Sequence, residues 1–125
     1  LEKAWETLDI FHLDKLANEY AGNLSGGQRK LLEMARVMMM DPSMILLDEP
    51  MAGVNPTLKK QIITLIKKLS KDGYTFLLVE HDMDVVMNHC NPIIVMHNGG
   101  VIVEGTPSEI STNERVIDAY LGGSE

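Results

Sequence analysis

The chain has 125 residues, a length that suits one domain with a hydrophobic core of its own. Hydrophobic residues make up 45% and charged residues 23%, which is typical of a globular protein and excludes a disordered or fibrous one. The formal net charge of −7 argues against general affinity for nucleic acid or anionic membranes, because both require a positively charged surface. One cysteine excludes an internal disulfide, and no apolar run approaches the roughly 20 residues of a membrane-spanning helix.

Helical patterns occupy the first part of the chain. Apolar residues from Leu1 to Phe11 recur at helical spacing, and a short second pattern follows a break at His12. The spacing predicts a further helix from Ser25 to about Met40. No capping residue precedes the first pattern, which predicts that the chain is a piece of a longer protein.

Short apolar segments then alternate with helices. The segments MILL, FLLV and IIVM are predicted strands, and because they are apolar throughout we expect a parallel sheet covered by helices on both faces. A helix capped by Asn55, with Pro56 in its first turn, is predicted to end at Gly73. Another runs from Asp82 to about His89. This alternation predicts an α/β layered core preceded by a helical segment.

Turn and capping signals mark the end of the chain. IIVM and VIVEG flank HNGG, which predicts a β-hairpin. The segment TPSE, from Thr106 to Glu109, is a capping box that opens short helices ending at LGGSE.

Ionisable residues follow two of the predicted strands. Asp48 and Glu49 come directly after the first strand, and Glu80, His81 and Asp82 follow the second. Ligands of α/β sheets gather at the carboxyl ends of strands. Two neighbouring carboxylates there suit a site in which one holds Mg²⁺ through water and the other orients or deprotonates an attacking water. The alternative is an acidic strand end without catalytic function.

The histidines alone indicate little. His81 could contact a phosphate or a positioned water, although a single histidine is more often structural. Zinc binding by His81, His89, Cys90 and His97 is not indicated, because the chain has no CxxC or HxxxH pair.

The stretch NLSGGQRK has a capping box in which Ser25 and Gln28 begin a helix. This box does not explain Gly26 and Gly27, since a glycine inside a helix lowers its stability by about 1 kcal/mol relative to alanine. Glycines in the first turn let a large ligand approach backbone N–H groups, where the helix dipole favours an anion. The stretch therefore predicts an anion site.

Four motifs together resemble those of the nucleotide-binding subunit of ATP-binding cassette (ABC) transporters. LSGGQ is similar to the signature motif, MILLDEP to the Walker B strand, AGVN to the D-loop and VEHD to the switch-histidine loop, in the family's order from Leu24 to Asp82. VEHDMDVVM, AGVNP, EGTPSEI and VIDAYLGG resemble the branch that serves branched-chain amino acid importers. Relatives that import urea, short amides or other amino acids could share these segments.

The resemblance implies ATP and Mg²⁺ as cofactors. It implies that Asp48 helps to hold Mg²⁺, that Glu49 is the general base or water-orienting residue, and that His81 contacts the γ-phosphate. It also implies that a second subunit's ATP is bound by the signature residues Leu24, Ser25, Gly26, Gly27 and Gln28. Asn55 stands where much of the family has an acid; it could bond across the dimer, and its catalytic role stays open because it also caps a helix.

The resemblance also implies a fold and partners. The fold would be part of a P-loop NTPase (RecA-like) core with a mostly parallel sheet: residues 1–41 in the helical signature subdomain, 42–106 in the ATPase core and 107–125 in C-terminal helices. The partners would be a second ATP-binding subunit, arranged head to tail, and transmembrane permease subunits. The chain would lie in the cytoplasm on the inner face of the membrane, without inserting into it and without binding nucleic acid.

Several expected parts of such a subunit do not occur in the sequence. There is no G-x-x-x-x-G-K-[ST] loop (Walker A), no adenine-stacking aromatic residue before the signature motif and no glutamine loop, so the chain resembles the C-terminal half. We expect that the chain alone neither binds ATP tightly nor hydrolyses it. The family's Walker A strand lies between FLLV and IIVM, so we expect this gap to be closed up, filled by another chain, or completed by a further segment of the parent protein.

Two other functions fit parts of the pattern. A soluble ABC ATPase of translation or chromosome maintenance would carry coiled-coil arms or basic surfaces, which the net charge of −7 does not indicate. A non-catalytic half-subunit could donate only LSGGQ to a partner's ATP, but such a module would not need Asp48 and Glu49.

Overall fold

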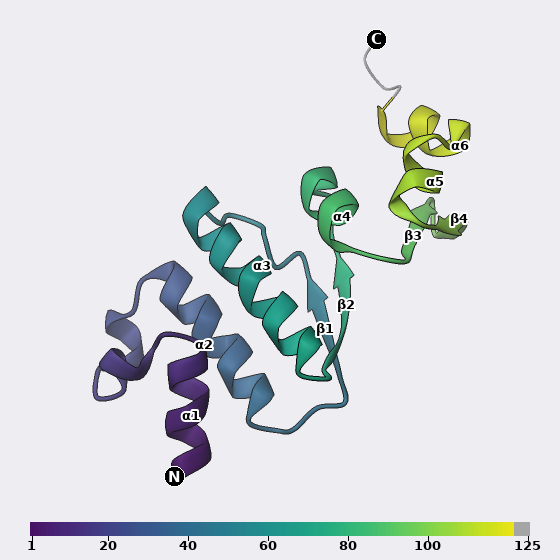
Figure 1. Cartoon of the computed structure of the whole chain (residues 1–125). Coiled ribbons are helices and arrows are strands. Elements are labelled where there is room, and N and C mark those ends of the chain that lie inside the picture. Colours follow the sequence, from purple (N-terminus) through teal and green to yellow (C-terminus); the bar gives the residue numbers. More distant parts are fainter. Residues whose placement is uncertain (122–125) are drawn as a thin grey trace. The chain divides into compact units, whose positions relative to one another are not determined.

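The computed structural model describes residues 1–121, which fall into two compact units that divide after Val79 (Figure 1). The first unit contains α1 (Glu2–Ile10), two short 3-10 turns η1 (Asp14–Leu16) and η2 (Ala21–Asn23), α2 (Gly26–Met38), β1 (Met44–Asp48), α3 (Pro56–Lys71) and β2 (Thr75–Val79). The second contains α4 (Met83–His89), β3 (Ile93–His97), β4 (Gly100–Gly105), α5 (Pro107–Ser111), α6 (Glu114–Val116) and a π-helical turn η3 (Ile117–Leu121). These elements confirm the predicted α/β order.

Local residue chemistry sets the ends of the main helices. Ser25 and Gln28 form the predicted capping box of α2, and the side-chain oxygen of Asn55 accepts a 2.9 Å hydrogen bond from the Leu58 N–H at the start of α3. Gly73, with φ of +104°, follows the end of α3 in a conformation that favours glycine. His12 has φ of +57°, which confirms the predicted break after the first helix.

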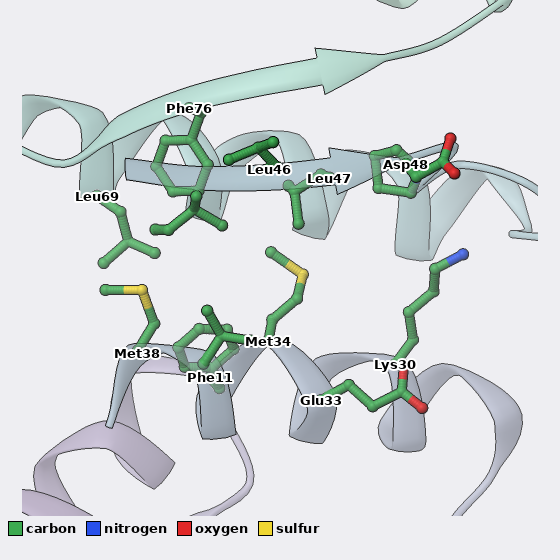
Figure 2. A pocket seen from close by; sticks show the side chains of 13 residues that line it. Phe11, Lys30, Glu33, Met34, Met38, Leu46, Leu47, Asp48, Leu69 and Phe76 are labelled. Carbon is green, nitrogen blue, oxygen red and sulfur yellow. The ribbon is translucent and has the colours of Figure 1, made fainter. Parts of the chain in front are cut away.

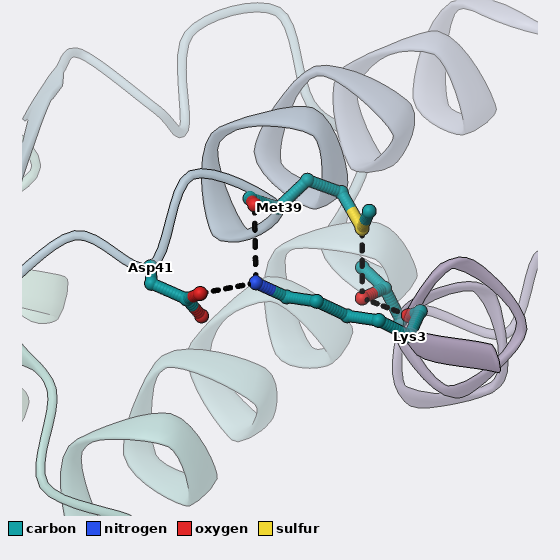
Figure 3. A network of polar contacts seen from close by, with 4 residues as sticks. Lys3, Met39 and Asp41 are labelled. Carbon is teal, nitrogen blue, oxygen red and sulfur yellow. Dashed lines mark hydrogen bonds and ion pairs between the residues drawn. The ribbon is translucent and has the colours of Figure 1, made fainter. Parts of the chain in front are cut away.

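A polar network fixes α1 to the end of α2 (Figure 3). The Lys3 Nζ donates to the Met39 carbonyl at 3.1 Å and forms an ion pair with Asp41. The Thr7 hydroxyl donates to the Lys3 carbonyl at 2.8 Å and contacts the Met39 sulfur at 3.3 Å. Both members of the ion pair are well exposed, so the apolar contacts beneath them contribute more to stability than the pair does.

The first unit has its core on one face of a two-stranded parallel sheet. β1 and β2 pair in register, with Met44 opposite Thr75 and Asp48 opposite Val79. Ile45 is only 5% exposed, and it lines a cavity together with residues of α2 and with Leu69 of α3. The other buried apolar residues of this unit are Phe11, Leu13, Leu24, Leu31, Ala35, Met38, Met51, Ile62, Leu65 and Leu69.

The opposite face of this sheet is apolar and exposed. Met44 is 48%, Leu46 69%, Leu77 42% and Val79 53% exposed. The expectation of helices on both faces is therefore wrong for this sheet within the first unit, residues 1–79. The strands are apolar on both faces, but the described elements of this unit cover only one of them.

The described strands pair in two separate sheets. Among the described residues, β2 pairs only with β1, and β3 pairs only with β4 in an antiparallel hairpin. The strands of FLLV and IIVM thus belong to separate two-stranded sheets. The parallel part of the fold is the β1–β2 pair.

The second unit is built on the predicted hairpin. Asn98 and Gly99 both have positive φ, 49° and 77°, as a type I′ turn requires. Its core contains Ile93, Ile110 and Val116, against which α4 also packs. The end of the described chain lies on the hairpin, because the Tyr120 hydroxyl donates to the Met96 carbonyl and the Arg115 guanidinium donates to the Ile102 carbonyl at 3.2 Å.

Two ionisable groups of this unit have shifted pKa values. Burial raises the pKa of the Cys90 thiol above its ordinary value, and the negative charge of Glu80 raises it further, so the thiol stays protonated at neutral pH. Hydrogen bonds from the Thr106 N–H and, to a smaller extent, from the Thr106 hydroxyl lower the pKa of the Glu109 carboxyl. The bond from the Thr106 N–H is also part of the predicted capping box of α5. No helix among residues 1–121 combines the length and apolar character needed to span a membrane.

Candidate functional site

The two strand-end acids occupy different backbone conformations. Asp48 is the last residue of β1, and Glu49 follows it in the left-handed region with φ of +46°. Both side chains are exposed. For a residue other than glycine this conformation costs about 1 kcal/mol or more, and such strain occurs preferentially at functional sites.

Hydrogen bonds hold Glu49 in this conformation. Its N–H donates to the Val79 carbonyl at 2.8 Å, so the pairing between β1 and β2 continues one residue beyond Asp48. Its carbonyl accepts from the Ala52 N–H at 3.0 Å, which starts a turn toward α3. The two neighbouring acids therefore differ in backbone conformation, Asp48 in the strand and Glu49 in the left-handed region.

The start of α2 presents an exposed set of donors. The Ser25 Oγ accepts from the Gln28 N–H at 3.2 Å, and the Gln28 side-chain oxygen accepts from the Ser25 N–H at 2.8 Å. The first N–H groups of a helix have no partner within the helix. No atom outside the local backbone lies within 4 Å of a Cβ placed on Gly26. A large anion could therefore approach the backbone at Gly26.

Gly27 has a packing role that the sequence did not indicate. A Cβ at this position would lie 2.5 Å from the Leu58 Cδ2 in the first turn of α3. The absence of a side chain lets the start of α2 approach the start of α3 closely. Of the two glycines, Gly26 is the one whose surroundings leave space for a ligand.

We predict that Gly27→Ala destabilises the chain relative to Gly26→Ala by about 0.5 to 1 kcal/mol, because the half-buried Leu58 side chain must leave its rotamer to make room for the new methyl group. Gly26→Ala should be neutral or slightly stabilising, since alanine favours helix and meets open space. Denaturant unfolding of the two variants measures the difference. Adding Leu58→Ala should relieve the Gly27→Ala defect; equal effects of the two glycine substitutions would contradict the packing role.

The remaining residues predicted for the first-unit site have distinct positions. Leu24 is only 8% exposed, so its side chain anchors the motif in the core instead of facing a ligand. Asn55 caps α3 and is exposed at the end of the loop that starts at Glu49. The Lys30 Nζ, from the second turn of α2, donates to the Ala52 carbonyl of that loop at 3.2 Å. The structure thus brings Asp48, Glu49, Asn55 and the start of α2 together in one unit.

His81 follows β2 in the sequence, but it belongs to the second unit, in which it precedes α4. Beside it, the Asp82 carboxylate accepts from the Val85 N–H at 3.2 Å and caps α4. Among residues 1–121, no group of three or more histidine, cysteine, aspartate or glutamate side chains is arranged to hold a metal ion. Mg²⁺ commonly keeps water and phosphate oxygens among its ligands.

A cavity of about 230 Å³ lies between α2 and the covered face of the sheet (Figure 2). Met34 and Met38 point from α2 toward the sheet, and Lys30 extends toward the end of β1, where Asp48 lies. The polar side chains that line it are Lys30, Glu33 and Asp48. A triphosphate would meet one cation and two carboxylates there, so the mainly apolar cavity is not suited to hold a nucleotide.

Lys30 and Leu58 are the residues of this region that sequence reasoning missed. Lys30 was visible only as part of the basic run after LSGGQ, and nothing in the sequence indicates that its partner is a backbone carbonyl 22 residues away. Leu58 is visible in the sequence only as an apolar residue of the helix after Asn55, and its contact with Gly27 depends on how two helices meet.

Comparison with known proteins agrees with the family that the sequence motifs resemble. Residues 1–52 match the family described as ABC transporter, and residues 101–125 match the family described as branched-chain amino acid ATP-binding cassette transporter. The probable branched-chain amino acid transport ATP-binding protein LivG of Archaeoglobus fulgidus is 46% identical over 125 residues, which are 100% of this chain and 49% of that protein. The high-affinity branched-chain amino acid transport ATP-binding protein BraF of Pseudomonas aeruginosa is 44% identical, over 98% of this chain and 48% of its own length.

A solved structure agrees with these relatives. The crystal structure of an ATP-binding cassette of an ABC transporter, in its ADP conformation, superposes with a TM-score of 0.87 and 40% sequence identity, over 97% of this chain and 49% of that one. The chain spans about half the length of the curated relatives it matches. It therefore corresponds to about half of an ABC transporter ATP-binding protein, and the relatives named above belong to the branched-chain amino acid branch.

Proposed function

We propose that the chain is part of the ATP-hydrolysing subunit of an ABC importer for branched-chain or other amino acids. In this function it supplies the signature motif, the Walker B acids and the switch histidine to the composite ATP sites of a head-to-tail dimer. The observation that carries the proposal is the joint placement, in one unit, of two exposed acids at the end of β1 and an exposed glycine-bearing start of α2. The relatives' names supply the substrate class.

The residues have separate roles in this proposal. Asp48 helps to hold Mg²⁺ through water, and Glu49 takes a proton from, or orients, the attacking water. His81 contacts the γ-phosphate. The exposed strand-end carboxylates fit the oxygen ligands that Mg²⁺ prefers, and when bound the ion would neutralise charge that develops on the phosphates.

The start of α2 serves the nucleotide of the second subunit. Ser25 and the N–H groups at Gly26 and Gly27 donate to the γ-phosphate, with Gln28 holding the helix end in shape. Asn55 forms a hydrogen bond across the dimer. The space around Gly26 supports the approach of such an anion.

These proposed roles require an assembly of several subunits. The partners are a second ATP-binding subunit and transmembrane permease subunits, so the chain lies in the cytoplasm at the inner face of the membrane. Within the subunit, residues 1–41 belong to the helical signature subdomain, 42–106 to the ATPase core and 107–125 to the C-terminal helices. The hairpin that ends at Gly105 and the Thr106 cap of α5 support the boundary after residue 106.

Comparison of the isolated chain with a hybrid subunit tests the proposal. In the hybrid, this chain replaces the matching half of the Archaeoglobus fulgidus relative, to which it is 46% identical. We expect the hybrid to hydrolyse Mg-ATP, and the isolated chain to bind ATP several powers of ten more weakly and to show no turnover. The 125 residues contain no Walker A loop, whose charge-assisted bonds to phosphate contribute about 1.5 to 3 kcal/mol each.

Two controls define this comparison. The unmodified relative shows the turnover to expect, and thermal unfolding shows that the hybrid is folded. A folded hybrid without ATPase activity would refute the proposed function. Ordinary turnover by the isolated chain would refute its dependence on the remaining half.

A further inference from the structure

The segment from Glu49 to Asn55, here called the 49–55 loop, is held against the start of α2 by a lysine. The Lys30 Nζ donates to the Ala52 carbonyl at 3.2 Å, and Ala52 is near the middle of the loop. Lys30 itself is half-buried, and its side chain extends from α2 toward the end of β1 (Figure 2). A charged donor therefore reaches the loop from the same helix that begins with the signature motif.

A second contact, independent of the first, joins α2 to the other end of the loop. Leu58 follows the Asn55 cap by three residues and lies so close to Gly27 that a Cβ there would be 2.5 Å from its Cδ2. The first turn of α3 is thus packed directly on the first turn of α2. The loop between β1 and α3 has α2 as a common support at its middle and its end.

The loop needs such support because of its own backbone. Glu49 and Gly53 both have left-handed φ values, +46° and +66°. Inside the loop, the Ala52 N–H donates to the Glu49 carbonyl at 3.0 Å and the Val54 N–H donates to the Met51 carbonyl at 3.3 Å. The Glu49 N–H is bonded to Val79 and Met51 is buried, whereas Ala52 and Gly53 are exposed. Short exposed turns of this kind open easily without a contact from outside. The bond to the Ala52 carbonyl fixes the turn that also determines the conformation of Glu49.

We infer that Lys30 is a positioning residue that holds the 49–55 loop, and with it Glu49, in a fixed position relative to the start of α2. The consequence for turnover rests on the proposed function. In a head-to-tail dimer, Glu49 serves the nucleotide of its own subunit and the Ser25 end of α2 serves the partner's nucleotide. Lys30 then joins a group of one ATP site to a group of the other through a single hydrogen bond.

Amide hydrogen exchange on the 125-residue chain tests the positioning role directly. Lys30→Met keeps the apolar stem and removes the donor, and we expect it to raise the exchange rates of the Ala52 and Val54 amides about fivefold to tenfold, the effect of losing one partly exposed hydrogen bond. Lys30→Arg should restore slow exchange. Lys67→Met, the same charge change on an exposed lysine of α3, is the matched control and should leave both amides within about twofold of their original rates.

Two results in this experiment would overturn the inference. One is unchanged exchange of Ala52 and Val54 in Lys30→Met. The other is an equal rise throughout α2 and α3, because that would show general loosening and not release of the loop.

Turnover in the hybrid subunit gives the second readout. We expect Lys30→Met to lower kcat severalfold while the KM for ATP stays within about twofold, since Lys30 orients Glu49 and does not bind the nucleotide. Lys30→Arg should recover at least about half of the lost kcat. An unchanged kcat in Lys30→Met would contradict the role in turnover. If the hybrid with Lys30 intact has no activity, the proposed function fails, while amide exchange still decides whether Lys30 holds the loop.

Discussion

In the hybrid subunit, Glu49→Gln is expected to lower ATP turnover by at least about a hundredfold, because a positioned proton acceptor contributes about 10² to 10⁴ to a rate. The substitution keeps the length of the side chain and the left-handed backbone, whose N–H and carbonyl are already bonded to Val79 and Ala52. Stability and ATP affinity should therefore change little. Steady-state turnover, equilibrium ATP binding and thermal unfolding measure the three quantities.

The matched control for this substitution is Glu33→Gln. Glu33 lines the cavity beside Asp48, is exposed, and loses the same charge, so it reports any general electrostatic effect on the site. We expect its turnover to stay within about twofold of the original, as for a surface change away from the reacting atoms. A Glu49→Gln hybrid that retained most of its activity would exclude Glu49 as the base and leave Asp48 or His81 to be examined.

Much of the fold could be predicted because it is encoded in short segments. The Ser25–Gln28 box, the Asn55 cap and the turn at Asn98 and Gly99 each satisfy backbone groups or permit positive φ within four residues. Hydrophobic spacing located the helices and strands for the same reason. Local chemistry of this kind acts in a half-length chain as it does in a longer one.

Which elements bury the two faces of the strands could not be predicted in the same way. An apolar strand pattern reports that both faces of the strand are suited to burial, but it does not say which segment of which length buries them. Ile45 and Leu46 are equally apolar neighbours, yet one is 5% and the other 69% exposed. The difference arises from the number of elements available to the sheet, which is a property of the whole subunit.

The candidate site shows the same limit at the level of single residues. Residue type and position along the chain were enough to identify Asp48 and Glu49, because acidic residues after an apolar strand can be recognised in the sequence. The packing of Gly27 on Leu58 and the bond from Lys30 to the Ala52 carbonyl depend on the distance between α2 and the segment after β1. A glycine explained by ligand approach thus proved to have a packing partner, and an unremarked lysine proved to hold a loop.

The exposed face of the β1–β2 sheet gives the second prediction of large effect, because in the hybrid we expect the other half of the subunit to cover it. Met44, Leu46, Leu77 and Val79 form a continuous apolar surface, and the relatives are about twice as long as this chain. Burying a leucine contributes about 1.5 to 3 kcal/mol, so four such side chains would bind the remaining half strongly. Elements of that half are therefore expected to cover this face in the hybrid.

Leu46→Glu should distinguish the isolated chain from the hybrid. In the isolated chain the side chain is 69% exposed, so a carboxylate remains in water and the free energy of unfolding should change by no more than about 0.5 kcal/mol. In the hybrid the same carboxylate would have to be buried without a partner, and a loss of several kcal/mol is expected. Denaturant unfolding of both proteins, with ATP turnover of the hybrid, measures the contrast.

Ile45→Glu is the matched control, because Ile45 is the neighbouring residue on the covered face and is 5% exposed. It should destabilise the isolated chain and the hybrid alike by several kcal/mol, since the carboxylate is placed in the same core in both. The predicted signature is therefore a large difference between the two proteins for Leu46→Glu and none for Ile45→Glu. A hybrid that tolerated Leu46→Glu as well as the isolated chain does would show that the remaining half leaves this face open.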